Sequence, residues 1–242
     1  MADLQNGNSI TEEGIPVQET LSVGLLLAMT GGFLDVYTYL LRGGVFANAQ
    51  TGNMVLLSIA AAQKDFVRAA YYLIPIAAFF MGVLITEYIK KHFTDRQQTL
   101  WMHIVLIIEI FLLFPIGFLP RDIPDAVVNV TVSFICSMQV NSFRKTHGLP
   151  YATTMCTGNL RSAAEYFFIF AASKDKNAGK QSAHYFLIIL AFLFGAAAGT
   201  FLCGVWDGKA IWACGLFLFP VLWIMRPNRK GKKLFSRYKR NN

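Results

Sequence analysis

The segment DVYTYLLRGGVFANAQTGN, residues 35–53, determines the predicted fold because the chain contains a second version of it. The second version, NSFRKTHGLPYATTMCTGN, spans residues 141–159. Each begins with a short polar residue two positions before an aromatic one, passes Gly or Pro, and closes on Thr-Gly-Asn. The two triplets lie 106 residues apart, and an apolar helical stretch follows each. Helix-breaking polar sequence at corresponding places among apolar segments indicates two related halves of a membrane protein.

The composition also predicts a membrane protein. Of the 242 residues, 55% are hydrophobic and only 15% are charged, and the mean hydropathy is +0.44. A soluble domain carries about 25% charged residues. A helix needs roughly 20 apolar residues to cross a hydrocarbon core of about 30 Å, and six stretches come close to or exceed this. They are Ser22–Leu41, Phe66–Ile89, Leu100–Leu119, Ala126–Phe143, Ala183–Val205 and Ile211–Met225.

A shorter apolar stretch follows each Thr-Gly-Asn triplet. Met54–Ala62 has nine residues, which as a helix cover about half of a membrane at 1.5 Å per residue, and Asn159–Ala172 corresponds to it. We therefore predict an all-α polytopic membrane protein with six transmembrane helices and two half-length helices, re-entrant or broken, in an inverted 3+3 repeat. The predicted parts are a disordered cytoplasmic tail at 1–21, membrane repeats at 22–119 and 126–225, and a basic cytoplasmic tail at 226–242.

The distribution of positive charge predicts how the chain is oriented. With six crossings, both termini share one side with sixteen of the 22 Lys and Arg residues, eight of them in the C-terminal tail. Arg161 lies inside a helix. Because cytoplasmic loops carry the excess of Lys and Arg, we expect both termini in the cytoplasm. Five residues remain for the opposite side, namely Arg42, Lys64, Arg68, Arg121 and Lys209.

The two triplets are the first candidate binding residues. A helix that starts inside the membrane points unpaired N–H groups, with partial positive charge, at the middle of the bilayer. Asn or Thr can cap those groups, and Gly lets the backbone turn. Two such ends meeting from opposite faces would form a midplane site for a small polar or anionic solute; the alternative is an ordinary helix cap near the interface. The residues concerned are Thr51, Gly52, Asn53, Thr157, Gly158 and Asn159.

Acidic and amide side chains within the apolar stretches complete the candidate site. An ionised carboxylate at the bilayer centre costs roughly 3 kcal/mol or more, so such groups usually face a cavity or a partner. Asp35, with Asn141 as its counterpart in the second half, is therefore a candidate substrate-binding residue. Asp35 and Glu109 are also candidates for proton coupling, with a purely structural hydrogen bond as the alternative for Glu109.

Several classes of function lack support in the sequence. The four histidines are scattered without metal-ligand spacing, and no phosphate-binding G-x-x-x-x-G-K-[ST] loop is present. The four cysteines have no C-x-x-C spacing and lie in or beside apolar segments, which favours free thiols. The net charge of +8 is concentrated beside the last span and is typical of a membrane-surface anchor rather than a nucleic-acid site. We expect no metal, no cofactor, no nucleic-acid partner and no enzymatic activity.

The motif residues resemble those of the YoaK-like transmembrane proteins of bacteria, a family of unknown function. The resemblance is carried by GGFLDVYTYLLRGGVFANAQTGN, residues 31–53, and MQVNSFRKTHGLPYATTMCTGNL, residues 138–160, and it covers nearly the whole chain. Matching residues are Gly32, Asp35, Phe46 before the first triplet, Gln139 with Asn141, and Thr153-Thr154 before the second. The chain departs from the family pattern at Val36, Gln50 and Val140. The last departure leaves open whether Gln139 or Asn141 takes the family position, so both are candidate binding residues.

The resemblance implies a multi-pass protein of the bacterial inner membrane and supplies no substrate. Two functions are favoured by the sequence, and a third, an intramembrane enzyme, would need two reactive groups within hydrogen-bond reach in a cavity. The first is a secondary transporter or channel for a small polar solute. The second is a membrane scaffold or interaction protein whose intramembrane polar residues only hold helices together. The expected partners are the lipid bilayer, a small polar solute in the first case, and another copy of the chain if the protein forms a homo-oligomer.

Overall fold

The computed structural model describes residues 15–93, 98–120, 122–153 and 156–226, and most of these residues are helical. One short antiparallel hairpin interrupts the helices, with Lys145 opposite Pro150. The elements in order are η2 (Val17–Glu19), α1 (Leu21–Leu41), α2 (Gln50–Ala62), α3 (Phe66–Lys91), α4 (Gln98–Ile116), α5 (Asp125–Ser142), β1 (Lys145–Thr146), β2 (Leu149–Pro150), α6 (Cys156–Ser173), α7 (Lys176–Trp206), η4 (Asp207–Ala213) and α8 (Cys214–Ile224). The all-α prediction is confirmed.

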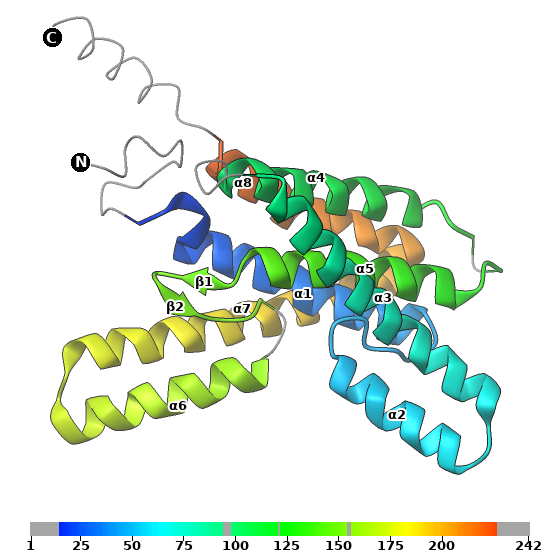
Figure 1. The fold of residues 1–242 in the computed structure, drawn as a ribbon, viewed down its shortest axis with the longest axis horizontal. Helices are drawn as coiled ribbons and strands as arrows, with labels where there is room; N and C mark the ends of the chain where they lie inside the picture. Colours follow the sequence, from blue (N-terminus) through cyan, green and yellow to red (C-terminus); the bar gives the residue numbers. More distant parts are fainter. Residues whose placement is uncertain (1–14, 94–97, 121, 154–155, 227–242) are drawn as a thin grey trace, which may run out of the picture.

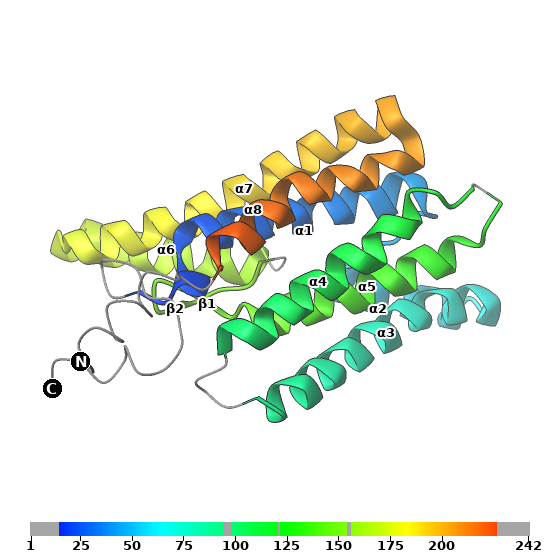
Figure 2. The same ribbon diagram turned by 90° about the horizontal axis from the view of Figure 1, so that it is seen from above.

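The long helices alternate in direction. Helices α1, α4 and α7 start at the end of the molecule where Val17 and Ile224 lie, and α3, α5 and α8 run back toward it (Figures 1 and 2). We refer to this as the termini end. Helices α2 and α6 lie on the same side of the long helices in Figure 1. They point in opposite directions, with their N-terminal ends toward the middle of the molecule.

Four stretches of the described residues are long and apolar enough to cross a membrane. They are Leu21–Leu41, Phe66–Lys91, Thr99–Ile116 and the 49-residue stretch Lys176–Ile224, which turns back on itself at η4 and so contains both α7 and α8 (Figure 2). Helix α5 is not among the four; it carries Asp125, Asn129, Gln139 and Asn141 along its 18 residues. A membrane protein is thus supported by the length and composition of the helices.

Several helix boundaries differ from the sequence-based prediction. The expected half-length helices begin earlier, at Gln50 and Cys156, so each Thr-Gly-Asn triplet lies within the first turns of its helix instead of before it. Helix α7 begins at Lys176 because the Asp175 side chain caps it, accepting a hydrogen bond from the Asn177 N–H at 2.9 Å. The short helix Val17–Glu19 falls within the segment 1–21 predicted to be disordered; residues 1–14 and 227–242 lie outside the described residues.

Close helix contacts through glycine hold the bundle together. Helix α1 packs against α7 and α8, and α5 packs against α3 and α4. A Cβ atom added to Gly195 of α7 would collide with the Met29 carbonyl of α1, and one added to Gly82 of α3 would collide with the Phe134 carbonyl of α5. Such small residues let helix backbones approach closely in a membrane, where packing rather than the hydrophobic effect drives association.

Candidate functional site

The chain leaves α1 at Arg42 and returns to the middle of the same helix. Gly43 and Gly44 have φ values of 78° and 72°, a left-handed conformation that glycine adopts without strain. The side-chain nitrogen of Asn48 then donates to the Gly31 carbonyl at 3.1 Å. Gly31 lies ten residues before the end of α1, about 15 Å along the helix axis. The segment before α2 therefore reaches deep into the bundle.

Asp35 anchors this returning segment. Its Oδ1 accepts a hydrogen bond from the Asn48 backbone N–H at 3.0 Å, and both residues are buried, with 6% and 4% of their surface exposed. The Asn48 side-chain oxygen has no hydrogen-bond partner within the described residues. Irregular backbone at membrane depth persists only inside protein or beside a water-filled cavity. The Asp35–Asn48 pair meets this condition by satisfying the returning backbone from within the protein.

Helix α5 closes the other side of this polar region. The Ser133 hydroxyl of α5 donates to the Ala47 carbonyl at 2.9 Å, and the Gln50 amide nitrogen donates to the same oxygen at 2.7 Å. The start of α2 thus lies between α1 and α5, one helix from each half of the chain. We call Asp35, Asn48, Gln50, Asn53 and Ser133 the central polar cluster.

The asparagines of the two triplets make the same contact in both halves. The Asn53 side-chain nitrogen donates to the Phe46 carbonyl at 2.9 Å, and that of Asn159 donates to the Ala152 carbonyl at 2.7 Å. In each case the acceptor lies seven residues earlier. The predicted capping role is not observed for α2, whose N-cap residue Ala49 makes no side-chain cap bond. Each buried asparagine instead ties the start of its helix to the loop that precedes it.

The remaining triplet residues face outward. Thr51, Thr157 and Gly158 are exposed, and Gly52 is half-buried. A Cβ atom added to Gly158 would have no neighbour within 4 Å. Any contact of these residues with a solute therefore depends on their exposed surface.

Replacing either triplet asparagine by alanine is expected to destabilise the protein by about 1 to 3 kcal/mol, the cost of leaving a buried hydrogen-bonding group unpaired. The free energy of unfolding in detergent measures this for Asn53→Ala and Asn159→Ala. The exposed neighbours provide the control, because Thr51→Ala and Thr157→Ala are expected to stay within about 0.5 kcal/mol of the parent. Equal losses in all four variants would contradict the assigned role.

Gln139 and Asn141 of α5 contact different helices. The Gln139 amide nitrogen donates to the Leu27 carbonyl of α1 at 3.2 Å; Leu27 lies eight residues before Asp35, about 12 Å along the helix. Asn141 is half-buried near the termini end and donates to Glu87 of α3 at 2.9 Å. Of the two, Gln139 therefore contacts α1, and Asn141 contacts α3.

Glu109 is a fully buried carboxyl group on α4, with 1% of its surface exposed. Neither of its carboxyl oxygens has a hydrogen-bond partner within the described residues. The Cys136 thiol of α5 lies near enough to Glu109, Asp35 and Asn48 to interact with all three. A carboxyl group with no partner inside a membrane protein is a candidate for a functional role, because its ionised form is costly to bury.

Arg42 is the functional candidate that the sequence did not identify. We expected it on an aqueous face, yet none of its surface is exposed, and its guanidinium nitrogens have no hydrogen-bond acceptor in the described part of the chain. Its charge is balanced by Asp125 at the start of α5, with 3.7 Å between Nη1 and Oδ1. Its carbonyl accepts a hydrogen bond from Asn129 at 2.9 Å. Arg42 thus joins the two halves at the end opposite the termini.

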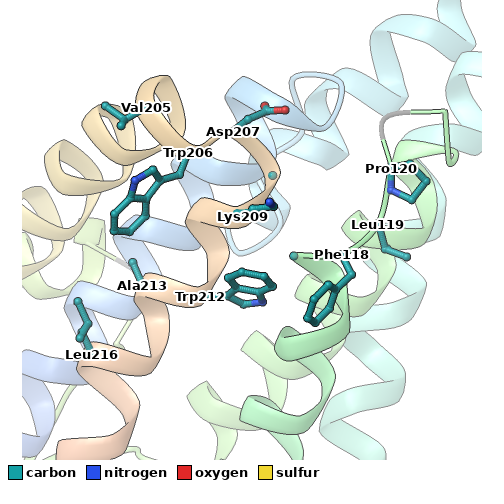
Figure 3. A pocket seen from close by; sticks show the side chains of 12 residues that line it. Phe118, Leu119, Pro120, Val205, Trp206, Asp207, Lys209, Trp212, Ala213 and Leu216 are labelled. Atoms are coloured by element: carbon teal, nitrogen blue, oxygen red, sulfur yellow. The ribbon is translucent and has the colours of Figure 1, made fainter.

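An aromatic cleft of about 950 Å³ lies at the same end as Arg42. Figure 3 shows Phe118 and Trp212 side by side in its lining, together with Trp206 and Lys209. The Phe118 and Trp212 rings pack edge to face, with 4.8 Å between their centroids. The Trp212 indole N–H donates to the Phe114 carbonyl at 2.9 Å. None of the sequence-predicted site residues lines this cleft. Tryptophan and tyrosine gather where helices meet the membrane–water interface, and the cleft has that composition.

Within the described residues, no three His, Cys, Asp or Glu side chains come together in a way that could hold a metal ion. All four cysteines are free thiols; three are buried, and Cys156 is half-buried.

The fold and its buried polar groups define a polytopic helical membrane protein. The chain belongs to the family described as "Protein of unknown function (DUF1275)", which matches residues 23–224. It is similar to the UPF0700 transmembrane protein YoaK of Bacillus subtilis (strain 168), at 30% identity over 146 residues. That match covers 58% of this chain and 64% of the relative's length, which is less than two thirds. No solved structure matches the chain. The predicted family resemblance is confirmed.

Proposed function

We propose that this protein is a secondary transporter or channel for a small polar or anionic solute, with its site at the central polar cluster. The observation that carries the proposal is the pairing of Asp35 with the backbone of Asn48 in the middle of α1. Polar helix starts near mid-membrane mark the binding sites of many transporters. We assign no catalytic step to the chain.

An inverted repeat of residues 22–119 and 126–225 forms part of the proposal. Its support is that contacts recur in pairs: α1 with α7 and α8, and α5 with α3 and α4. The Asn53 and Asn159 hydrogen bonds to their loops also recur, at matching positions 106 residues apart. Helices α2 and α6 run in opposite directions from the middle (Figure 1). In this arrangement α2 and α6 are re-entrant and the other six helices cross the membrane.

Asp35 and Glu109 are the proposed proton-coupling residues. Both are acidic, buried and within the helices proposed to cross the membrane. Their helices, α1 and α4, both pack against α5. Burying a protonated carboxyl group inside the membrane costs far less free energy than burying an ionised one. Gain or loss of a proton would therefore strongly change the stability of any conformation in which the carboxyl group is buried.

The second candidate function is a scaffold or interaction protein, possible alone or as a homo-oligomer. The observation that favours it is that the side-chain nitrogens of Asn53 and Asn159 donate to their own loops. A scaffold needs the polar groups only for packing. Accumulation of a solute distinguishes the two functions, because only the transporter or channel moves one across a membrane.

The uptake of small polar metabolites is the experiment that tests the proposed function. Strains that lack or overproduce the protein are compared for metabolite uptake and retention, and each difference is followed with purified protein in proteoliposomes. We expect at least one polar or anionic solute to cross the vesicle membrane only when the protein is present. Vesicles that pass no solute identified by the strain comparison would support the scaffold instead.

The orientation in the bacterial inner membrane is expected to place both termini in the cytoplasm. In a variant without its native cysteines, Gln63→Cys and Lys209→Cys should react with a membrane-impermeant maleimide in intact spheroplasts. Lys90→Cys, near the end of α3, and Lys176→Cys, at the start of α7, should react only after the membrane is opened. The positive charge at the termini end is the physical reason. Labelling of Lys90→Cys in intact spheroplasts would reverse the orientation.

A further inference from the structure

A second cavity, of about 450 Å³, lies at the termini end of the molecule. It is bounded by η2, the end of α3, the start of α4, the end of α5 and the β1–β2 hairpin. Lys90, Arg144 and Lys145 line it together with a single acidic residue, Glu19. We call it the basic cavity. It is separate from the central polar cluster, and none of the residues of that cluster lines it.

The hairpin holds two of the three cations in place. His147 and Gly148 have φ values of 48° and 74° and form its tight turn. The His147 N–H donates to the Glu19 carbonyl at 2.7 Å, which ties the hairpin to η2. Arg144 and Lys145, at the start of the hairpin, are thereby fixed on the same cavity as Lys90 of α3.

The positive charge in the basic cavity is poorly neutralised. Neither Arg144 nor Lys145 forms an ion pair within the described residues. Lys90 lies 3.6 Å from Glu87, and both side chains are about half exposed, a geometry in which an ion pair contributes little. Three cations facing one cavity repel one another, and an anion bound among them would relieve that repulsion.

A buried donor without a partner also lines the cavity. Gln18 has 2% of its surface exposed, and its side-chain nitrogen has no hydrogen-bond acceptor within the described residues. Its side-chain oxygen is occupied, accepting a bond from the Thr99 hydroxyl at 3.5 Å. A buried amide N–H that lacks an acceptor costs about 1 to 3 kcal/mol. A ligand with acceptor oxygens would satisfy it once the Gln18 amide turns into the cavity that this residue lines.

We propose that the basic cavity binds a phosphate group. A phosphate group offers several acceptor oxygens and carries one negative charge as a diester or up to two as a monoester. Arginine matches it with paired N–H donors, and lysine adds a point charge. In this site Arg144 supplies the paired donors, Lys90 and Lys145 supply charge, and Gln18 supplies the neutral donor. Basic pockets between membrane helices bind the headgroups of anionic lipids; a soluble phosphate ester carries the same group.

Isothermal titration of the full-length protein in neutral detergent tests the site and its source of phosphate. The probes are dioctanoyl phosphatidylglycerol, dioctanoyl phosphatidylcholine and glycerol 3-phosphate. We expect saturable binding of at least one of the two anionic probes and tenfold weaker or absent binding of the zwitterionic lipid. Preference for the anionic lipid assigns a lipid headgroup, and equal or stronger binding of glycerol 3-phosphate assigns a soluble ester.

Matched variants distinguish specific binding in the basic cavity from general attraction of an anion to a positively charged protein. Arg144→Gln/Lys145→Gln should weaken binding at least tenfold, since each cation near an anionic headgroup contributes about fivefold. Lys176→Gln/Lys180→Gln removes the same charge from exposed positions of α7 outside the cavity and should leave affinity unchanged. Gln18→Leu alters no charge and should weaken binding about threefold or more, with the melting temperature as the folding check.

The proposal is overturned if neither anionic probe saturates, or if the two double variants lose affinity equally. Unchanged binding in both Gln18→Leu and Arg144→Gln/Lys145→Gln would also overturn it. Transport does not enter this measurement, so the result is independent of the function proposed for the central polar cluster.

Discussion

Replacing Asp35 by asparagine is expected to abolish solute transport, or to uncouple it from protons, while the protein still folds. Asparagine keeps the shape of the side chain and an oxygen that can accept the hydrogen bond from the Asn48 N–H, which is 3.0 Å long in the parent protein. It cannot carry a titratable charge. If Asp35 had a purely structural role, the protein would tolerate the change, because the variant removes only the ionised carboxylate, which is costly to bury.

The measurement is uptake into proteoliposomes of a solute identified by the strain comparison, with the melting temperature in detergent as the folding control. Asp35→Ala is the informative companion, since it removes the acceptor and leaves the Asn48 N–H unpaired, which should lower stability by about 1 to 3 kcal/mol. Normal uptake by Asp35→Asn would remove Asp35 from the proposed mechanism and favour the scaffold function.

Substituting alanine for Gly195 or Gly32 is expected to disrupt the contact between α1 and α7. A Cβ atom on Gly195 would overlap the Met29 carbonyl, and one on Gly32 would overlap the Phe192 carbonyl. Both obstacles are backbone atoms, which cannot move aside as a side chain can. The two helices must separate, and we expect each variant to lose at least about 2 kcal/mol of stability, in the upper part of the range for overpacking.

Gly204 provides the matched control for these variants. It lies on α7 as Gly195 does, and an added Cβ would have no neighbour within 4 Å. Gly204→Ala should therefore be neutral or slightly stabilising, because alanine is the better helix former by about 1 kcal/mol. Thermal unfolding in detergent compares the three variants. Equal melting temperatures for Gly195→Ala and Gly204→Ala would contradict the close packing of α1 on α7.

The sequence predicted which segment contains the candidate site but not every residue that forms it. The polar run before the first triplet was identified, and Asp35 was identified within α1. Nothing in the order of residues distinguished Asn48 from its neighbours, although it makes two of the bonds that hold the run at mid-helix. Ser133 and Cys136 likewise gave no signal, since a hydroxyl or thiol in an apolar helix commonly has only a packing role.

Two residues make contacts that the sequence did not predict, because those contacts depend on where a chain segment lies along its neighbours. Arg42 follows an apolar stretch and is followed by two glycines, which favours an aqueous interface, yet α5 and the turn after α7 cover it and none of its surface is exposed. Asn141 matches Asp35 in the repeat, yet it contacts Glu87 near the end of α3. Sequence spacing counts residues, while contact depends on how far one helix is displaced along another.

The sequence alone determined that this is a helical membrane protein, because apolar runs and their lengths are local properties of the chain. The polar breaks between those runs predicted two related halves. Its charges also predicted an orientation. Only the tertiary structure decided which polar groups meet: Asp35 with Asn48, Arg42 with Asp125, and Gln139 with Leu27. Those pairings depend on the depth and rotation of each helix, which are set by backbone contacts such as Gly195 on Met29, between residues far apart in the chain.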